Sequence, residues 1–309
     1  MYGHQNIDPP PTDVVMTVGT FDGVHLGHQA IIREVVRRAR ETAGTSVVYS
    51  FYPPPWRVLG RTTNPFLVTT FGDKAALIAS LGVDLLVTDA FTSDFQRLGA
   101  EEFAHEALVS SFHPREVLIG YDFRFGQERR GDLELLRREL ARHGASARQI
   151  DAVRHDGEIV SSTRIRRAVV EGDVAGAARL LGRYHFMAGA VVHDRGRGSA
   201  LGFPTANLSP RTELTPGPGV YAVMLETDDG RWSGVANLGY RPTFAEQNFS
   251  VEAFLFDFEG DLYGRRARMY FVDRIRGERK FGSREELVEQ IERDVACVRG
   301  KLPFPDAPE

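Results

Sequence analysis

The sequence predicts an α/β protein of two domains: a doubly wound parallel sheet, followed by a small antiparallel β-barrel with a C-terminal helix. Short apolar runs alternate with helical patterns from Val14 to about Leu181, which is the rhythm of a parallel doubly wound sheet. After Gly182, strand-like runs are separated by glycine and proline turns, as in a compact barrel. A chain of 309 residues has room for both, and we expect domains at 1–182 and 183–309.

The first domain is expected to hold parallel strands with helices between them. An apolar run at residues 14–18 breaks at Gly19, and a helical pattern starts at Gly27. Ligands of such sheets bind at the carboxyl ends of the strands, so we expect functional residues there. The other strand patterns lie at residues 46–51, 84–87, 116–119 and 147–153, and the other helical patterns at residues 73–81, 100–108, 133–143, 163–171 and 174–181.

The second domain is expected to be an antiparallel barrel. A helix should follow the barrel, because Ser283 and Glu286 have the spacing of a capping box. Leu287, Ile291 and Val295 give this helix one apolar face that can pack on the barrel. The strand patterns lie at residues 184–192, 220–227, 232–237, 250–256 and 266–275.

Composition favours a cytoplasmic enzyme with small-molecule partners. A net charge of -4 and a pI near 6.2 argue against a nucleic-acid or membrane-surface partner. Residues 1–12 are polar and proline-rich, unlike a secretory signal, and no stretch approaches the roughly 18 apolar residues of a membrane span. Cys297 stands alone, which excludes an internal disulfide and a cysteine-rich zinc site.

The loop between the first strand and helix is the first candidate site. A strand, a glycine-containing loop and a helix start aim backbone amides at one point, where an anion can bind. His25 and His28 stand at this point. Two histidines three apart can also be surface residues or metal ligands, but no nearby pattern supplies a third zinc ligand. Phosphate chemistry is therefore the first hypothesis.

A second basic motif opens the helix at residues 163–171. Ser161, Ser162, Thr163 and Arg164 combine hydroxyls, helix amides and a guanidinium, which can clamp the outer phosphates of a nucleotide. The alternative is a helix cap with a solvated basic face. Together with the His-x-Gly-His tetrapeptide, this motif resembles those of the nucleotidyltransferase superfamily.

The second domain carries a glycine-rich stretch, Gly196-Arg-Gly-Ser-Ala-Leu-Gly-Phe-Pro-Thr-Ala-Asn207. Its spacing fits neither a P-loop nor a dinucleotide-binding fingerprint. Blocks further along are GVY at Gly219, RPTF at Arg241, VEAFLFDFEGDLYG at Val251 and KFGSREEL at Lys280. With these blocks, the whole chain resembles the bacterial bifunctional riboflavin kinase/FMN adenylyltransferase (FAD synthetase) family.

This resemblance implies two ATP-dependent reactions. Riboflavin and ATP would give FMN and ADP, and FMN and a second ATP would give FAD and pyrophosphate. The implied cofactor is Mg²⁺ with ATP, and the implied partners are ATP, riboflavin and FMN. FMN and FAD would be substrate and product rather than prosthetic groups, and the protein a monomer or a weak homo-oligomer.

In the kinase half, the resemblance places Thr205 and Asn207 on Mg²⁺ and the ATP phosphates. It places Gly198, Gly202 and Pro204 in the ATP-binding loop. Glu252 would be the base that faces the ribityl 5′-hydroxyl, a role that phosphoryl transfer requires. The alternative is that strand alternation points Glu252 into solvent.

In the adenylyltransferase half, the resemblance makes His25 and His28 donors to the α- and β-phosphates. Ser161, Ser162, Thr163 and Arg164 would hold the leaving pyrophosphate, and no covalent enzyme intermediate is required. The resemblance also assigns Gly19, Phe21 and Gly27 to the phosphates, and Asp122, Phe123 and Phe125 to the flavin. The aromatic residues among them can equally pack in the core, so both interpretations stay open.

Four positions depart from the family pattern. Tyr52 and Pro54 replace a usual acidic residue and a usual histidine, and Asp194 and Ser199 replace a usual glycine and a usual basic residue. The first pair motivates an alternative function, a riboflavin kinase with an impaired or silent adenylyltransferase half. A non-catalytic flavin-binding protein is the other alternative, and the presence of Thr205, Asn207 and Glu252 argues against it.

Overall fold

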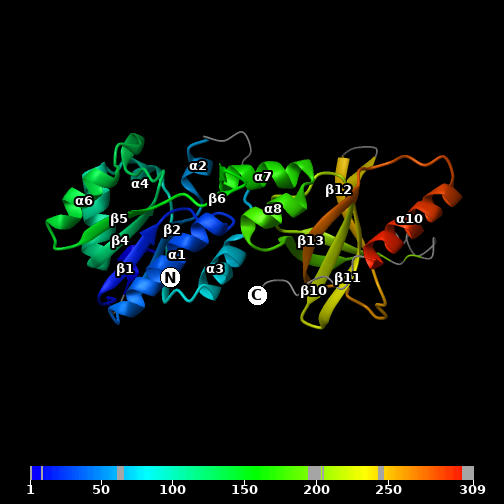
Figure 1. Cartoon of the computed structure of the whole chain (residues 1–309), viewed down its shortest axis with the longest axis horizontal. Coiled ribbons are helices and arrows are strands. Elements are labelled where there is room, and N and C mark those ends of the chain that lie inside the picture. Colours follow the sequence, from blue (N-terminus) through cyan, green and yellow to red (C-terminus); the bar gives the residue numbers. More distant parts are fainter. Residues whose placement is uncertain are drawn as a thin grey trace. The chain divides into compact units, whose positions relative to one another are not determined.

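The computed structural model of the chain forms two compact units (Figure 1). It describes residues 2–7, 10–60, 66–193, 203, 205–242 and 247–300. One unit comprises Met1–Pro65 and Phe71–Val160, and the other comprises Phe66–Thr70 and Ser161–Glu309. The predicted division of the two activities at residue 183 stays a prediction.

The first unit is built on a five-stranded parallel sheet, in the order β3-β2-β1-β4-β5. This confirms the predicted doubly wound sheet. The chain order reverses beside β1, and the carboxyl end of the strands at such a reversal is the expected ligand position. The strands are β1 (Val14–Val18), β2 (Ser46–Phe51), β3 (Leu85–Asp89), β4 (Pro114–Gly120) and β5 (Ser146–Ile150).

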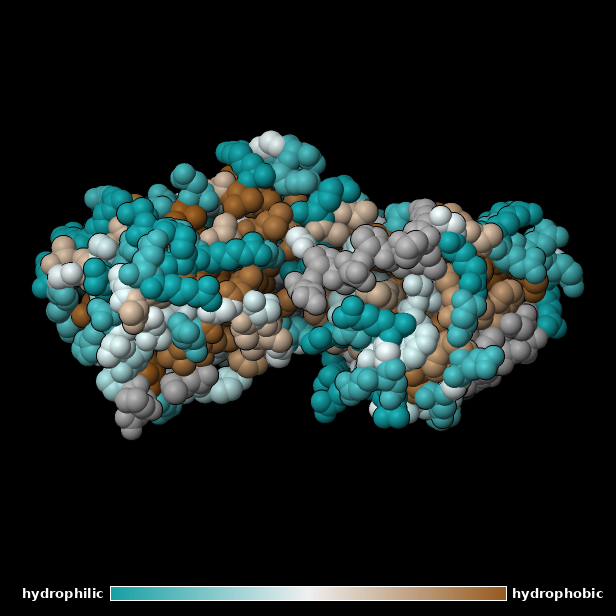
Figure 2. Space-filling model, turned by 60° about the horizontal axis from the view of Figure 1, so that its bottom comes forward, coloured by the Kyte–Doolittle hydropathy of each residue, from teal (hydrophilic) through white to brown (hydrophobic). Residues whose placement is uncertain are grey.

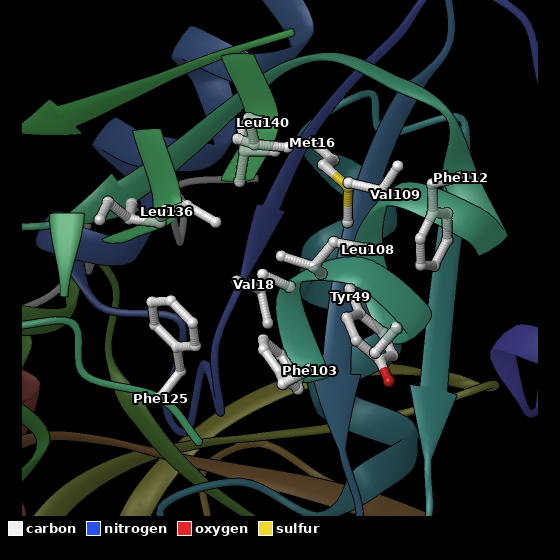
Figure 3. Packing of buried hydrophobic residues seen from close by; sticks show 14 of the residues in the cluster. Met16, Val18, Tyr49, Phe103, Leu108, Val109, Phe112, Phe125, Leu136 and Leu140 are labelled. Carbon is white, nitrogen blue, oxygen red and sulfur yellow. The ribbon is translucent and has the colours of Figure 1, made fainter. Parts of the chain in front are cut away.

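Helices cover both faces of this sheet. Successive side chains of a strand point to opposite faces, and here apolar side chains on both faces pack on helices. Val14, Met16 and Val18 face a core shared with η2 (Phe103–Ser110) and α6 (Leu133–Ala141) (Figure 3). Val15 faces the other way and packs on α1 (Leu26–Glu41), while Val48 packs on α1 and α3 (Phe71–Ser80).

The shorter elements connect this framework. The helix expected over residues 100–108 is a single turn, α5 (Ala100–Glu102), that continues as the π-helical η2. The others are η1 (His4–Asn6), α2 (Pro55–Val58), α4 (Ser93–Arg97), η3 (Gln127–Arg129), β6 (Arg154–His155) and β7 (Glu158–Ile159).

The second unit contains a closed antiparallel barrel, in the order β10-β11-β12-β9-β8-β13, which confirms the predicted architecture. The sequence patterns did not indicate β9, because its residues Thr-Ala-Asn-Leu-Ser-Pro lack a strong apolar alternation. Pairing with β12 and β8 on its two sides makes it a strand. The strands are β8 (His185–Val192), β9 (Thr205–Pro210), β10 (Gly219–Thr227), β11 (Gly230–Pro242), β12 (Gln247–Leu255) and β13 (Arg266–Arg276).

Helices also belong to this unit: α7 (Ser162–Glu171), α8 (Val174–Leu181) and α10 (Arg284–Arg299). The Ser283 hydroxyl caps α10 as predicted, because it accepts a hydrogen bond from the Glu286 N–H, while the Glu286 carboxylate accepts from the Gly282 N–H rather than from the Ser283 N–H of a full capping box. Val295 and Val298 pack with Phe254 and Phe256 on the outside of the barrel.

The surface mixes hydrophilic and hydrophobic side chains (Figure 2). Among the described residues, no helix has the length and apolar character needed to cross a membrane.

An ion pair between a partly buried arginine and a buried carboxylate holds α10 to the end of β13. The Arg276 guanidinium donates to Asp294 through Nε at 3.0 Å and Nη2 at 2.8 Å, and Gln290 donates to the same carboxylate at 3.0 Å. Asp294 is 4% exposed. Removing one partner of such a pair leaves the other desolvated and unpaired.

We expect Asp294→Ala to lower the free energy of unfolding by about 3 kcal/mol. Urea unfolding followed by circular dichroism measures this loss. Glu292→Ala, at an exposed position of the same helix, is the matched control and should change it by less than about 0.5 kcal/mol. Equal losses in the two variants would contradict a stabilising role for the ion pair.

His185 in β8 makes the stability of the protein sensitive to acid. The ring is 2% exposed, and its Nε2 donates to the Leu214 carbonyl at 3.2 Å. Burial lowers the pKa of His185 from 6.5 to about 4. The unfolded chain therefore binds a proton at a pH where the folded chain does not, so acid favours unfolding.

We expect wild-type stability to fall by up to about 3 kcal/mol between pH 6.5 and pH 4 through this group alone. In His185→Gln, whose amide can still donate to Leu214, this part of the loss should disappear. Urea unfolding at pH 7 and pH 5 measures it, with the exposed His105→Gln as control. A pH dependence equal to wild type in His185→Gln would show that other groups cause it.

Candidate functional site

The loop from Gly19 to His25 follows β1 and leads into α1 at the carboxyl edge of the parallel sheet. Phe21 and Val24 have positive φ angles of 50° and 40°, and both side chains are buried. The Phe21 ring lies on Gly19, where an added Cβ would be 3.1 Å from it. This loop is therefore packed into one conformation.

His25 and His28 lie together at the start of α1. The rings stack with centroids 3.6 Å apart, and the rings of Phe21 and His28 form a T-shaped pair with centroids 5.2 Å apart. His25 caps the helix, since its Nδ1 accepts a hydrogen bond from the His28 N–H at 3.3 Å. In the neutral ring, the proton is then on Nε2, which makes that nitrogen a donor.

Gly27 makes this stacking possible. An added Cβ would lie 3.1 Å from Cε1 and 3.2 Å from Nδ1 of His25. The glycine therefore lets the His25 ring fold against the first turn of α1. The structure brings together the predicted residues Gly19, Phe21, His25, Gly27 and His28.

The segment after β4 holds the residues predicted to contact flavin. Phe125 is 6% exposed and belongs to the core, with its ring 5.5 Å from those of Phe103 and Phe123 (Figure 3). Asp122 is exposed. Phe125 is thus a packing residue, and its contact with flavin stays a prediction.

The second motif caps α7 in the other unit. The Ser161 hydroxyl accepts a hydrogen bond from the Arg164 N–H at 3.3 Å, so Ser162 and Thr163 occupy the first helical positions. Arg166 is 8% exposed and donates to the Phe66 carbonyl at 2.8 Å. This hydrogen bond joins α7 to the segment of residues 66–70, which belongs to the same unit.

On the barrel, Glu252 of β12 is the register partner of Asn207 in β9 and of Asn237 in β11. Directly paired residues in antiparallel strands share a face. Thr205 shares that face, since it pairs with Phe254, two residues after Glu252. The neighbours Val251 and Ala253 fill the barrel interior, so Glu252 lies on the outer face and is partly buried there. This position is compatible with both the predicted base and a solvated strand residue, so the role of Glu252 stays a prediction.

Three predicted phosphate-binding residues, Gly198, Gly202 and Pro204, lie outside the described residues. So do the departures at Asp194 and Ser199. Their roles stay predictions.

Comparison with known proteins decides the family. Residues 8–164 match the family model for FAD synthetase, and residues 181–302 match the one for riboflavin kinase. The bifunctional riboflavin kinase/FMN adenylyltransferase of Pseudomonas fluorescens is 38% identical over 298 residues, which cover 96% of each chain. The Bacillus subtilis protein of the same description is 36% identical over 94% of this chain and 93% of its own.

The chain belongs to the bifunctional riboflavin kinase/FMN adenylyltransferase family. It phosphorylates riboflavin to FMN and adenylylates FMN to FAD, with ATP as the second substrate of both reactions. The resemblance seen in the sequence is thereby confirmed. A solved Streptococcus pneumoniae structure, described as a macrolide-efflux protein, has the same fold, with a TM-score of 0.88 and 29% identity over 97% of this chain and 98% of that one.

Sequence reasoning missed three polar residues beside the sites of this bifunctional enzyme. Asn237 is found only through the pairing of β11 with β12. Asp22 and Lys74 are both buried at the edge of the parallel sheet, at 3% and 6% exposure. Lys74 is three, four and seven residues before Leu77, Ile78 and Leu81, which places it on the apolar face of the helix, and this spacing is a local signal that could have identified it as buried.

Proposed function

We propose that the two activities use two separate sets of residues, one around the His25–His28 pair and one on the outer face of β9 and β12. The observation that carries the proposal is the register that aligns Glu252 with Asn207 and puts Thr205 on the same face. Phosphoryl transfer to a hydroxyl needs a base and side-chain oxygens that can bind a metal ion, and this face offers a carboxylate and two such oxygens.

For adenylyl transfer, we assign the donor nitrogens of His25 and His28 to the α- and β-phosphate oxygens of ATP, with the N-terminus of α1 adding its positive end. An FMN phosphate oxygen attacks the α-phosphorus, and the bond to the bridging oxygen breaks with its electron pair leaving on pyrophosphate. Donors in place before the reaction stabilise the charge that develops. The assignment of Ser161, Ser162, Thr163 and Arg164 to the pyrophosphate stays a prediction, because these residues belong to the other unit.

For riboflavin phosphorylation, the ribityl 5′-hydroxyl oxygen attacks the γ-phosphorus of ATP while Glu252 takes the proton of that hydroxyl. The bond between the γ-phosphorus and the bridging oxygen breaks, and its electron pair leaves with ADP. Thr205 and Asn207 offer side-chain oxygens, the ligand type that Mg²⁺ prefers, and so fit the metal that accompanies ATP. Bound there, Mg²⁺ would neutralise phosphate charge.

One incubation tests the proposal. Purified protein with riboflavin, ATP and Mg²⁺ is sampled over time, and riboflavin, FMN and FAD are separated by chromatography. FMN should rise before FAD, pyrophosphate should accompany FAD, and EDTA should stop both steps. Accumulation of FMN without FAD or pyrophosphate would instead favour a silent adenylyltransferase half, which the Tyr52 and Pro54 departures motivate.

A further inference from the structure

A buried lysine joins the loop that carries the histidines to the neighbouring strand. Lys74 of α3 donates through Nζ to the Thr20 carbonyl at 3.2 Å and to the Ser50 hydroxyl at 2.9 Å. The Ser50 hydroxyl itself donates to the Thr20 carbonyl at 3.3 Å. Ser50 is fully buried near the end of β2, and Thr20 is the second residue after β1. Lys74 therefore links two strand ends at the ligand edge of the sheet.

The ammonium also lies near a buried carboxylate. Burial lowers the pKa of Lys74 from 10.5 to about 8, while the Asp22 carboxylate opposes this shift by raising it. Asp22 is only 3% exposed and lies within the same loop, between Phe21 and Gly23. A buried charge is costly unless it is paired and hydrogen-bonded, so each of these two groups offsets the cost of the other.

This arrangement matters for a loop that binds phosphates. An unbalanced carboxylate at Asp22 would repel the negative oxygens of ATP. The loop is held at its far end by the His25 cap of α1, and Lys74 holds it near its start at Thr20. A shift of the loop by 1 Å is enough to cost about 10²-fold in rate when it displaces a catalytic group.

We propose that Lys74 is a positioning residue for FMN adenylylation: it ties the Thr20 carbonyl to β2 and balances the charge of Asp22, and so holds His25 and His28 in place for the ATP phosphates. The inference rests on the proposed role of this histidine loop. Two separable effects follow from it, one on the turnover rate through the position of the loop and one on ATP affinity through the charge.

The test is a comparison of Lys74→Met, Asp22→Asn and the double variant in the full chain, with Lys280→Met at an exposed position as the control. Lys74→Met should lower kcat for FAD formation from FMN by about 10-fold or more and raise the KM for ATP, while kinase activity stays within twofold. Adding Asp22→Asn should return the KM towards wild type but leave kcat low. Lys280→Met should form FAD at the wild-type rate.

Two results would overturn the inference: unchanged FAD formation in Lys74→Met, or recovery of kcat as well as KM in the double variant. If Lys74→Met does not fold, as judged by its thermal unfolding, Ser50→Ala decides, since it removes one contact and keeps both charges. It should lower kcat by about threefold with no change in the KM for ATP, and an unchanged kcat would again reject the inference.

His28→Ala separates the failure of this inference from the failure of the proposed site. Full FAD formation in His28→Ala would reject the site itself. Loss of FAD formation in His28→Ala together with full activity in Lys74→Met would reject only the role of Lys74.

Discussion

Replacing Glu252 by glutamine is expected to slow riboflavin phosphorylation by about 10²-fold or more. The amide has nearly the shape of the carboxylate but cannot take the proton of the ribityl hydroxyl. Backbone pairing of β12 with β9 and β11 fixes the face on which residue 252 lies, so the variant should fold normally. The effect should therefore appear in kcat more than in the KM for riboflavin. Initial rates of ADP release measure it.

Two controls make the result specific. FAD formation from supplied FMN is proposed to use the separate residues around His25 and His28, so it should remain within twofold of wild type in Glu252→Gln. Glu259→Gln, at an exposed position just beyond β12, should leave both reactions unchanged. A kinase rate within threefold of wild type would show that Glu252 is not the base, and an equal fall in both reactions would argue against separate sites.

The sequence predicts the elements best where burial is most complete. The runs at residues 14–18 and 46–51 coincide with β1 and β2, because every residue of both strands is buried and most are apolar or β-branched. The start of the barrel helix is also predictable, since its N-cap depends only on local residues. By contrast, β9 depends on two partner strands that are distant in sequence, and its own composition does not predict it.

The same distinction applies to the sites. His25, Gly27 and His28 lie within one turn of chain, so their proximity follows from the sequence, although the ring stacking and the cap do not. Strand alternation decides which face Glu252 takes, but only the register places Asn237 beside it. Lys74 meets Thr20 across 54 residues of sequence, a contact that needs the folded sheet to exist.

Replacing His28 by alanine should reduce FAD formation by about 10²- to 10³-fold, the usual cost of removing one donor that stabilises charge in a transition state. His28 is the outer ring of the stacked pair, and it does not cap the helix. Its loss should therefore lower kcat while the thermal unfolding temperature stays near wild type. Pyrophosphate release from FMN and ATP measures the rate, and kinase activity in the same preparation serves as the internal reference.

His25→Ala gives a distinct expected result, and the pair of variants decides between chemistry and structure. His25 supplies the cap of α1, so its loss should lower the free energy of unfolding by about 1 kcal/mol in addition to slowing FAD formation. If both histidines acted only by packing, the activity losses would follow the stability losses, and His28→Ala would be the milder variant. A stable but inactive His28→Ala chain, beside an unaffected control such as the exposed His105→Ala, leaves phosphate binding as the role of that imidazole.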